Sequence, residues 1–311
     1  MTIDVIIPSY KPGPKFREML KRLEKQELPV RKIIVINTEK KYWKEEFEAC
    51  PILQVHHISK EEFDHGAARN LGASYSQADI FLCMTDDAMP ADGKLTKALV
   101  KAFENQGPDG EQVIEVYGRQ LAEKDCRMAE AYTRQFNYPD KSQLKTIKDL
   151  PRLGIKTFFA SNVCCAYRRK EFLELGGFIN RTIFNEDMIF AAKALKAGYA
   201  VQYEAKAKVI HSHNYSCFQQ FHRNFDLGVS QADHPEVFQG VPSVGEGVRL
   251  VKSTAAFLAG KKKFHLIPGL VINSGFKFLG YQLGKRYEKL PFWLVKRFAM
   301  NKNYWKMQEE K

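Results

Sequence analysis

The chain has 311 residues, of which 44% are hydrophobic and 27% are charged. This composition can bury a full core and excludes a disordered chain, and the length favours one large domain with an appendage, or two domains. The formal net charge is +12, but residues 250–311 hold 13 Lys and Arg against three acids, so the last fifth of the chain carries +10 of it.

No secretory signal is expected, because Met1-Thr2-Ile3-Asp4 leads directly into a strand-like run. The uncharged apolar stretch 264–276 is interrupted by Pro268 and Gly269 and is too short for a spanning helix. The six cysteines show no C-x-x-C spacing, so we expect buried, reduced thiols in a cytosolic protein.

Strand and helix patterns alternate over the first 85 residues. The strand-like runs are 5–7, 32–36, 54–58 and 80–84, and the helical patterns are 16–23 and the small-residue segment 66–73. This order predicts an α/β fold with a Rossmann-like, mostly parallel sheet flanked by helices. The absence of a G-x-G-x-x-G or Walker loop argues against a dinucleotide dehydrogenase and a P-loop NTPase.

Further along the chain, a strand is predicted near 116–119, followed by a polar stretch, 122–152, that we expect to form a mobile flap. An apolar run follows at 158–160, and a helix is predicted at 188–196, ended by Gly198. The composition becomes basic and aromatic from about residue 236. We therefore expect a catalytic domain at 1–235 and a helical extension at 236–311.

Two carboxylates, Asp86 and Asp87, follow the buried run 80–84. Ligands of open α/β sheets bind outside the carboxyl ends of the strands, and adjacent carboxylates repel each other unless a cation or a proton compensates. Hard oxygen ligands suit Mg²⁺ or Mn²⁺, with phosphate oxygens completing the shell. The alternative is a solvated turn in which one Asp caps a helix.

A second acidic pair, Glu186-Asp187, lies at the start of the predicted helix, where the partial positive charge favours ionised carboxylates. Such a carboxylate can act as the general base for an attacking hydroxyl. The alternative is simple capping, with Asn185 as the N-cap. His211 and His213 would share one face of a strand; His211 is the preferred metal ligand, and a core or rim role is the alternative.

Two segments could hold a nucleotide. Pro8-Ser9-Tyr10 is expected to form a tight loop at the end of the first strand, although an ordinary turn would explain the same residues. Arg69 and Asn70 could offer a guanidinium and an amide to a diphosphate or nucleobase. Their alternative roles are a surface ion pair and a helix cap.

Taken in order, these segments resemble the family 2 glycosyltransferases, which have the GT-A fold, over residues 1 to about 230. The marks are 6–10, 66–72, 86–90, 176–178 and 185–187. Within the family the chain is most similar to bacterial rhamnosyltransferases, through 63–66, 117–120, 136–139 and 211–216.

The resemblance implies an inverting, metal-dependent enzyme that moves a sugar, expected to be rhamnose from dTDP-rhamnose, onto a saccharide or lipid-linked saccharide in cell-surface polysaccharide synthesis. It implies that Asp187 is the base, that Glu186 orients acceptor hydroxyls, and that Asp87 and His211 hold Mg²⁺ or Mn²⁺. The residues implied for the nucleotide-sugar pocket are Pro8, Ser9, Tyr10, Asn37, Arg69, Asn70 and Asp86.

The chain departs from the family pattern in two places. Asn37 stands where many relatives carry an acidic residue that holds the nucleobase, and an amide has a different donor and acceptor pattern. The usual D-x-D is reduced to Asp86-Asp87-Ala88, which leaves Asp87 as the metal ligand and Asp86 near the ribose or sugar.

The basic, aromatic tail suits helices in an anionic membrane interface. We therefore expect a cytoplasmic protein bound peripherally to the inner face of the cell membrane; the alternative is that the aromatic residues only pack the tail onto the catalytic domain. Two other classes stay open, a metal-dependent phosphoesterase and a basic nucleic-acid-binding protein. No nucleic-acid-binding motif is present, so no nucleic-acid partner is expected.

Overall fold

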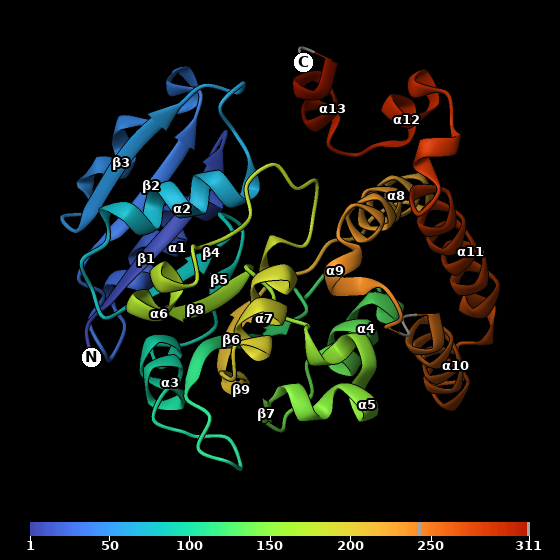
Figure 1. Ribbon diagram of the computed structural model, residues 1–311, viewed down its shortest axis with the longest axis horizontal. Coiled ribbons are helices and arrows are strands. Elements are labelled where there is room, and N and C mark those ends of the chain that lie inside the picture. Colours follow the sequence, from blue (N-terminus) through green and yellow to red (C-terminus); the bar gives the residue numbers. More distant parts are fainter. Residues whose placement is uncertain (242–243, 310–311) are drawn as a thin grey trace. The chain divides into compact units, whose positions relative to one another are not determined.

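A computed structural model describes residues 1–241 and 244–309 and divides the chain into two compact units (Figure 1). The first, called the sheet unit here, comprises Met1–Glu123, Tyr138–Asn180 and Glu186–His211. The second, called the helical unit, comprises Lys124–Asn137, Arg181–Asn185 and Ser212–Lys311. The division into a domain at 1–235 and an extension at 236–311 stays a prediction.

The sheet unit is built on one nine-stranded sheet in the order β3-β2-β1-β4-β8-β6-β9-β5, with β7 also paired to β9. The first four strands are mutually parallel, whereas β8 runs antiparallel to both of its neighbours, β4 and β6. The strands are β1 Ile3–Tyr10, β2 Ile33–Thr38, β3 Leu53–Ile58, β4 Ile80–Met84, β5 Met89–Pro90, β6 Val113–Leu121, β7 Gln143–Lys145, β8 Cys164–Arg168 and β9 Ala200–Ile210.

Helices flank this sheet, which confirms the predicted α/β class. In α1, Phe16, Met19, Leu20 and Leu23 recur at helical spacing and are buried. In α2, a Cβ on Gly72 would lie 2.3 Å from the Ile6 side chain, so only glycine lets this helix approach β1 so closely. The helices are α1 Pro14–Glu24, η1 Lys40–Tyr42, η2 Glu45–Ala49, α2 His65–Tyr75, α3 Leu95–Ala102, η3 Ile147–Asp149, α5 Leu150–Leu153, η4 Gly154–Thr157, α6 Arg169–Glu174 and α7 Glu186–Lys196.

The stretch 122–152 contains a helix, a strand and further helical turns, and a mobile flap there stays a prediction. Two other local predictions were wrong. Pro8, Ser9 and Tyr10 are the last residues of β1 and do not form a loop. Strand β9 ends at Ile210, so His211 and His213 follow the strand and do not share one of its faces.

The helical unit contains α4 and the C-terminal helices, as expected for the extension. Its helices are α4 Met128–Asn137, α8 Cys217–Asp233, α9 Pro235–Phe238, α10 Val244–Gly260, η5 Phe264–Leu266, α11 Ile267–Gly284, η6 Tyr287–Lys289, α12 Phe292–Phe298 and α13 Lys302–Glu309. A separate small core surrounds Phe225, Val229 and Trp305. Within the described residues, no helix combines the length and the hydropathy needed to cross a membrane.

Glycines allow α8 and α11 to pack backbone to backbone (Figure 1). A Cβ on Gly284 would lie 2.1 Å from the Phe225 carbonyl oxygen, and one on Gly280 would lie 2.3 Å from that of Phe221. Both distances are too short for any side chain. One side of α11 is therefore fixed against α8.

Candidate active site

The carboxyl ends of the parallel strands bring three of the predicted residues together. Ser9 Oγ and the backbone N–H of Tyr10 both donate to Asp86 Oδ2, at 3.1 and 3.3 Å. Burial raises the pKa of Asp86, and the charge of Asp87 adds to this, while the two donors oppose it. The end of β1 and the start of the turn after β4 are thus joined through one carboxylate.

Asn37 lies beside Ser9 in the β1–β2 register and is fully buried. Its Nδ2 donates to the Glu39 carbonyl oxygen at 3.3 Å and lies 3.0 Å from His57 Nδ1. Among the described residues, its Oδ1 is buried and has no hydrogen-bond partner. Because an unsatisfied buried acceptor costs about 1–3 kcal/mol, this oxygen is suited to accept a bond from a ligand.

An aromatic pair lies where β1 ends. The exposed ring of Tyr10 meets Tyr42 edge to face, with the ring centroids 5.5 Å apart. Lys11 Nζ lies 4.5 Å from the Tyr42 centroid and 5.2 Å from that of Tyr10. Two rings and a cation therefore stand at the same end of the strands as Asn37, where they could stack on a base and attract a phosphate.

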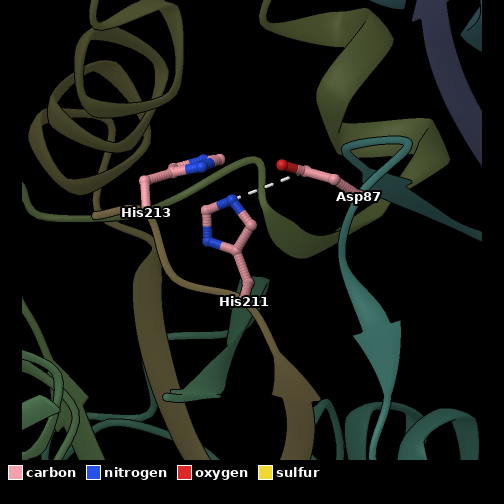
Figure 2. Close-up of side chains that lie close together, drawn as sticks. All are labelled: Asp87, His211 and His213. Carbon is pink, nitrogen blue, oxygen red and sulfur yellow. Dashed lines mark ion pairs between the residues drawn. The ribbon is translucent and has the colours of Figure 1, made fainter. Parts of the chain in front are cut away.

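Asp87 and His211 face each other, with 3.5 Å between Asp87 Oδ1 and His211 Nε2 (Figure 2). Two ligand atoms that each lie about 2 Å from one cation are at most about 4 Å apart, so one ion could bridge this pair. His213, also labelled in Figure 2, follows two residues later and belongs to the helical unit.

Gln120, which the sequence interpretation missed, orients His211. Its Oε1 lies 3.1 Å from His211 Nδ1, and its Nε2 lies 2.7 Å from the Tyr138 hydroxyl and 3.1 Å from Ser161 Oγ. Because Gln120 Oε1 can only accept, Nδ1 is the ring nitrogen that donates to it, and Nε2 is the nitrogen that faces Asp87. A hydrogen bond of this kind orients a histidine that binds a metal ion through its other nitrogen.

The second acidic pair begins α7. Glu186 is buried and lies 3.0 Å from Arg69 Nη1, while Asn162 Nδ2 donates to the same carboxylate oxygen at 3.1 Å. The backbone N–H of Asn162 donates to Asp187 Oδ2 at 2.9 Å. Asn162 therefore holds both acids. Asn185 Nδ2 donates to Ser230 Oγ at 3.1 Å, and the role of Asn185 as an N-cap stays a prediction.

The two neighbouring carboxyls have opposite pKa shifts. Burial opposes ionisation of Glu186, but the charges of Arg69 and His65 and the hydrogen bond from Asn162 together outweigh burial and lower the pKa. Burial and the negative charge of Glu186 raise the pKa of Asp187 to about 7, against the donated bonds from the N–H groups of Asn162 and Met188. An ionised Glu186 beside an Asp187 that titrates near neutrality is the arrangement that a general base needs.

A group of buried polar side chains near this pair was also missed by the sequence interpretation. The Tyr167 hydroxyl donates to Asn162 Oδ1 at 2.8 Å. Burial raises the pKa of Glu115 to about 8 and lowers that of Lys145 to about 7. Only Glu115, an acid in the middle of an apolar strand, leaves a visible signal in the sequence; Asn162 and Lys145 leave none.

The other predicted residues are placed as follows. Pro8 is partly buried in β1, beside Ile36 of β2. Asn70 bonds to both backbone groups of Phe178, at 2.8 and 3.0 Å, and donates to Asn180. The alternative of a surface ion pair for Arg69 is wrong, because its pair with Glu186 is buried. Ligand binding by these three residues stays a prediction.

Comparison with known proteins gives the family of this chain. Residues 4–176 match the model of glycosyl transferase family 2. The chain belongs to this family, which confirms the resemblance seen in the sequence and, with it, an inverting glycosyltransferase.

Two curated relatives match almost the whole chain. The O-antigen chain rhamnosyltransferase RfbN of Salmonella typhimurium is 39% identical over 98% of this chain and 96% of its own length. The O-antigen chain rhamnosyltransferase WbaN of Salmonella anatum is 36% identical over 97% of this chain and 95% of its own.

Solved structures show the same fold at low identity. The mannosyltransferase PcManGT from Pyrobaculum calidifontis, in complex with GDP-Man and Mn²⁺, is 16% identical, with a TM-score of 0.54 over 99% of this chain and 86% of that one. TarS 1–349 of S. aureus is 13% identical, with a TM-score of 0.51 over 93% and 91%. Both support the predicted GT-A fold.

Proposed function

We propose that the chain transfers rhamnose from dTDP-rhamnose, with inversion, onto a saccharide or lipid-linked saccharide acceptor during O-antigen synthesis. The observation that carries this proposal is the 39% identity to a rhamnosyltransferase across nearly the full length of both chains. This match extends beyond residues 4–176, the segment that matches the family model, so it includes the helical unit as well as the sheet unit.

The nucleotide of the donor would lie at the carboxyl ends of β1, β2 and β4. The unsatisfied Oδ1 of Asn37 is suited to accept the N3–H of thymine. Asp86, held by Ser9 and Tyr10, would accept from a ribose or sugar hydroxyl. Pro8, Arg69 and Asn70 complete the predicted set of nucleotide-sugar-binding residues. Arg69 would contribute through its ion pair with Glu186.

The residues present fit a divalent cation. Asp87 offers a hard oxygen and His211 an imidazole nitrogen on a ring that Gln120 orients, and both ligand types suit Mn²⁺ or Mg²⁺. When bound, the ion supplies positive charge that stabilises the departing diphosphate. We therefore assign Asp87 and His211 to the metal, with His213 as the alternative histidine.

Asp187 would act as the base and Glu186 would orient the acceptor. The acceptor hydroxyl gives its proton to the Asp187 carboxylate while its oxygen bonds to the anomeric carbon. The bond from that carbon to the diphosphate oxygen breaks on the opposite face, and its electron pair leaves with the nucleotide. One inversion results.

An acceptor carried on a lipid would place the enzyme at the cytoplasmic face of the cell membrane. The net charge of +10 in residues 250–311 supports attraction to anionic headgroups. No observation favours hydrolysis of phosphoesters or binding of nucleic acid.

The test is a panel of nucleotide sugars measured by thermal shift, followed by transfer assays with the stabilising donors. We expect dTDP-rhamnose with Mn²⁺ to raise the melting temperature more than UDP- or GDP-sugars do. If another nucleotide sugar stabilised the protein more, that compound would replace dTDP-rhamnose as the proposed donor. Stabilisation by oligonucleotide alone, or phosphate release without an acceptor, would overturn the proposal.

A further inference from the structure

The outward side of α11 is a continuous apolar stripe. Phe264 of η5 and Val271, Ile272, Phe278 and Leu279 of α11 are each more than half exposed. The four α11 residues, together with the exposed Pro268 and Gly275, recur every three or four residues, so they share one side of the helix. From Pro268 to Leu279 the stripe runs about 17 Å at 1.5 Å per residue.

The apolar side chains of this stripe are mostly exposed, whereas Gly280 and Gly284 pack against α8. The exposure is concentrated in this unit: twelve of the sixteen large hydrophobic side chains exposed in the described chain belong to it. A contiguous apolar patch of this kind marks an interaction surface.

The charges around the stripe indicate what covers it. Exposed bases stand at both ends, Lys261, Lys262 and Lys263 before it and Lys285 and Arg286 after it. Residues 250–287 contain seven Lys and Arg and no acidic residue. An anionic lipid surface matches this pattern, because its acyl region takes the apolar side chains and its headgroups take the bases. A protein partner would not need bases at both ends of the stripe.

We infer that α11 lies flat in an anionic membrane interface, with Phe264, Val271, Ile272, Phe278 and Leu279 in the lipid and the flanking bases on the headgroups. The inference rests on the proposed location at a membrane and names the side chains that make the contact. It predicts a fixed orientation of the helical unit, because the opposite side of α11 is held by α8.

The test compares the full chain with three variants by flotation with vesicles of phosphatidylcholine, with and without 30% phosphatidylglycerol. The stripe variant carries Val271→Asn, Ile272→Asn, Phe278→Ser and Leu279→Asn. The base variant carries Lys261→Gln, Lys262→Gln and Lys263→Gln. The control carries Leu173→Asn and Tyr75→Asn, exposed apolar side chains of the sheet unit.

We expect the wild type and the control to bind the anionic vesicles, less so as salt is raised. The stripe variant should lose at least tenfold in affinity at every salt concentration. The base variant should lose roughly 100-fold at low salt, since it removes three bases that each contribute about 1 kcal/mol near an anionic surface, and it should show a weaker salt dependence.

A second measurement reports insertion. Trp introduced as Phe278→Trp should shift its emission to the blue and be quenched by brominated phospholipid, whereas Leu173→Trp should not. Equal binding of all variants, or none by the wild type, would overturn the inference. So would a stripe variant that changes from dimer to monomer without losing vesicle binding, since the stripe would then be a subunit interface.

Donor-induced thermal stabilisation, measured in the same variants, separates this inference from the proposed function. Variants that fail on vesicles but respond to dTDP-rhamnose keep the donor assignment. A wild type that binds vesicles but responds to no nucleotide sugar would keep the membrane contact and reject the donor.

Discussion

Arg69 and Glu186 form an ion pair, 3.0 Å long, in which both side chains are almost fully buried. The residues are 117 positions apart in the chain, and Asp187 directly follows the acidic partner. A complete buried charge pair therefore stands beside the residue proposed as the base, and its two members affect that residue in opposite directions.

Removing Arg69 should be strongly destabilising, because it leaves the buried Glu186 without its counter-ion. Arg69→Met is expected to lower the free energy of unfolding by about 3–5 kcal/mol. The matched control is Lys97→Met, which breaks the exposed 3.0 Å pair with Glu27 and should cost less than about 1 kcal/mol. Denaturant unfolding measures both; equal losses would mean that the buried pair is not formed.

The pH dependence of activity should follow Asp187. Because its pKa is raised to about 7, the carboxylate that accepts the proton forms as the pH rises through about 7, and kcat/KM should rise with it. Glu186→Gln removes the negative charge that raises this pKa, so the acidic limb should move to lower pH. Glu174→Gln, an exposed acid, should leave the limb in place; a limb that moves upward in Glu186→Gln would contradict the assignment.

Asp187→Asn should keep the fold and donor binding but lower kcat by roughly 10²-fold or more, the scale of losing a general base. Donor affinity is read from calorimetry and turnover from a transfer assay. The exposed Asp140→Asn serves as the control for an added amide. If the Asp187 variant lost donor affinity and kept its turnover, Asp187 would be a binding residue.

The metal assignment predicts that Asp87→Asn and EDTA both abolish activity, because an amide is a poor ligand for a hard cation. Full turnover in EDTA would remove the metal from the mechanism. Gln120→Leu should weaken Mn²⁺ binding about 10- to 100-fold, the usual cost of losing a hydrogen bond that orients a ligand. Gln120→Glu keeps an acceptor for His211 Nδ1 and should bind Mn²⁺ more tightly than Gln120→Leu in a calorimetric titration.

The sequence predicted the elements whose burial produces a clear pattern of apolar residues. Residues 80–84 form β4 with the predicted bounds, because a strand buried on both faces reads as an uninterrupted apolar run. Strand β8 was missed, since Cys164-Cys165-Ala166-Tyr167-Arg168 shows neither alternation nor strong β-forming residues beyond Tyr167. The apolar run at 158–160 follows a helical turn and forms no strand.

At the site, the sequence identified the acids but not what holds them. Asp187 is held partly by a backbone N–H, that of Asn162, and a backbone donor leaves no trace in residue identity. Gln120 reaches His211 across 91 positions, between the ends of two parallel strands. Such contacts depend on the β6–β9 register, which residue patterns within either strand do not determine.

Two glycines of α11 give a matched test of its packing. Gly284→Ala should destabilise the protein by about 1–3 kcal/mol, because the new Cβ would lie 2.1 Å from the Phe225 carbonyl oxygen. Gly275→Ala meets nothing within 4 Å and should stabilise it by up to about 1 kcal/mol, the helix propensity gain. Thermal unfolding measures both; equal effects would show that α8 and α11 are not in close contact.

The backbone contact between α8 and α11 also determines how α11 should tolerate sequence change. On the side facing α8, even a methyl group is too large, so folding alone should reject every substitution there. On the outward side, folding should accept polar and apolar residues alike, and only membrane binding would discriminate between them. A deep mutational scan of α11 should therefore give two patterns, each with the period of an α-helix. Protein abundance should fall for substitutions on the side facing α8, and polysaccharide output should fall in addition for substitutions on the outward side.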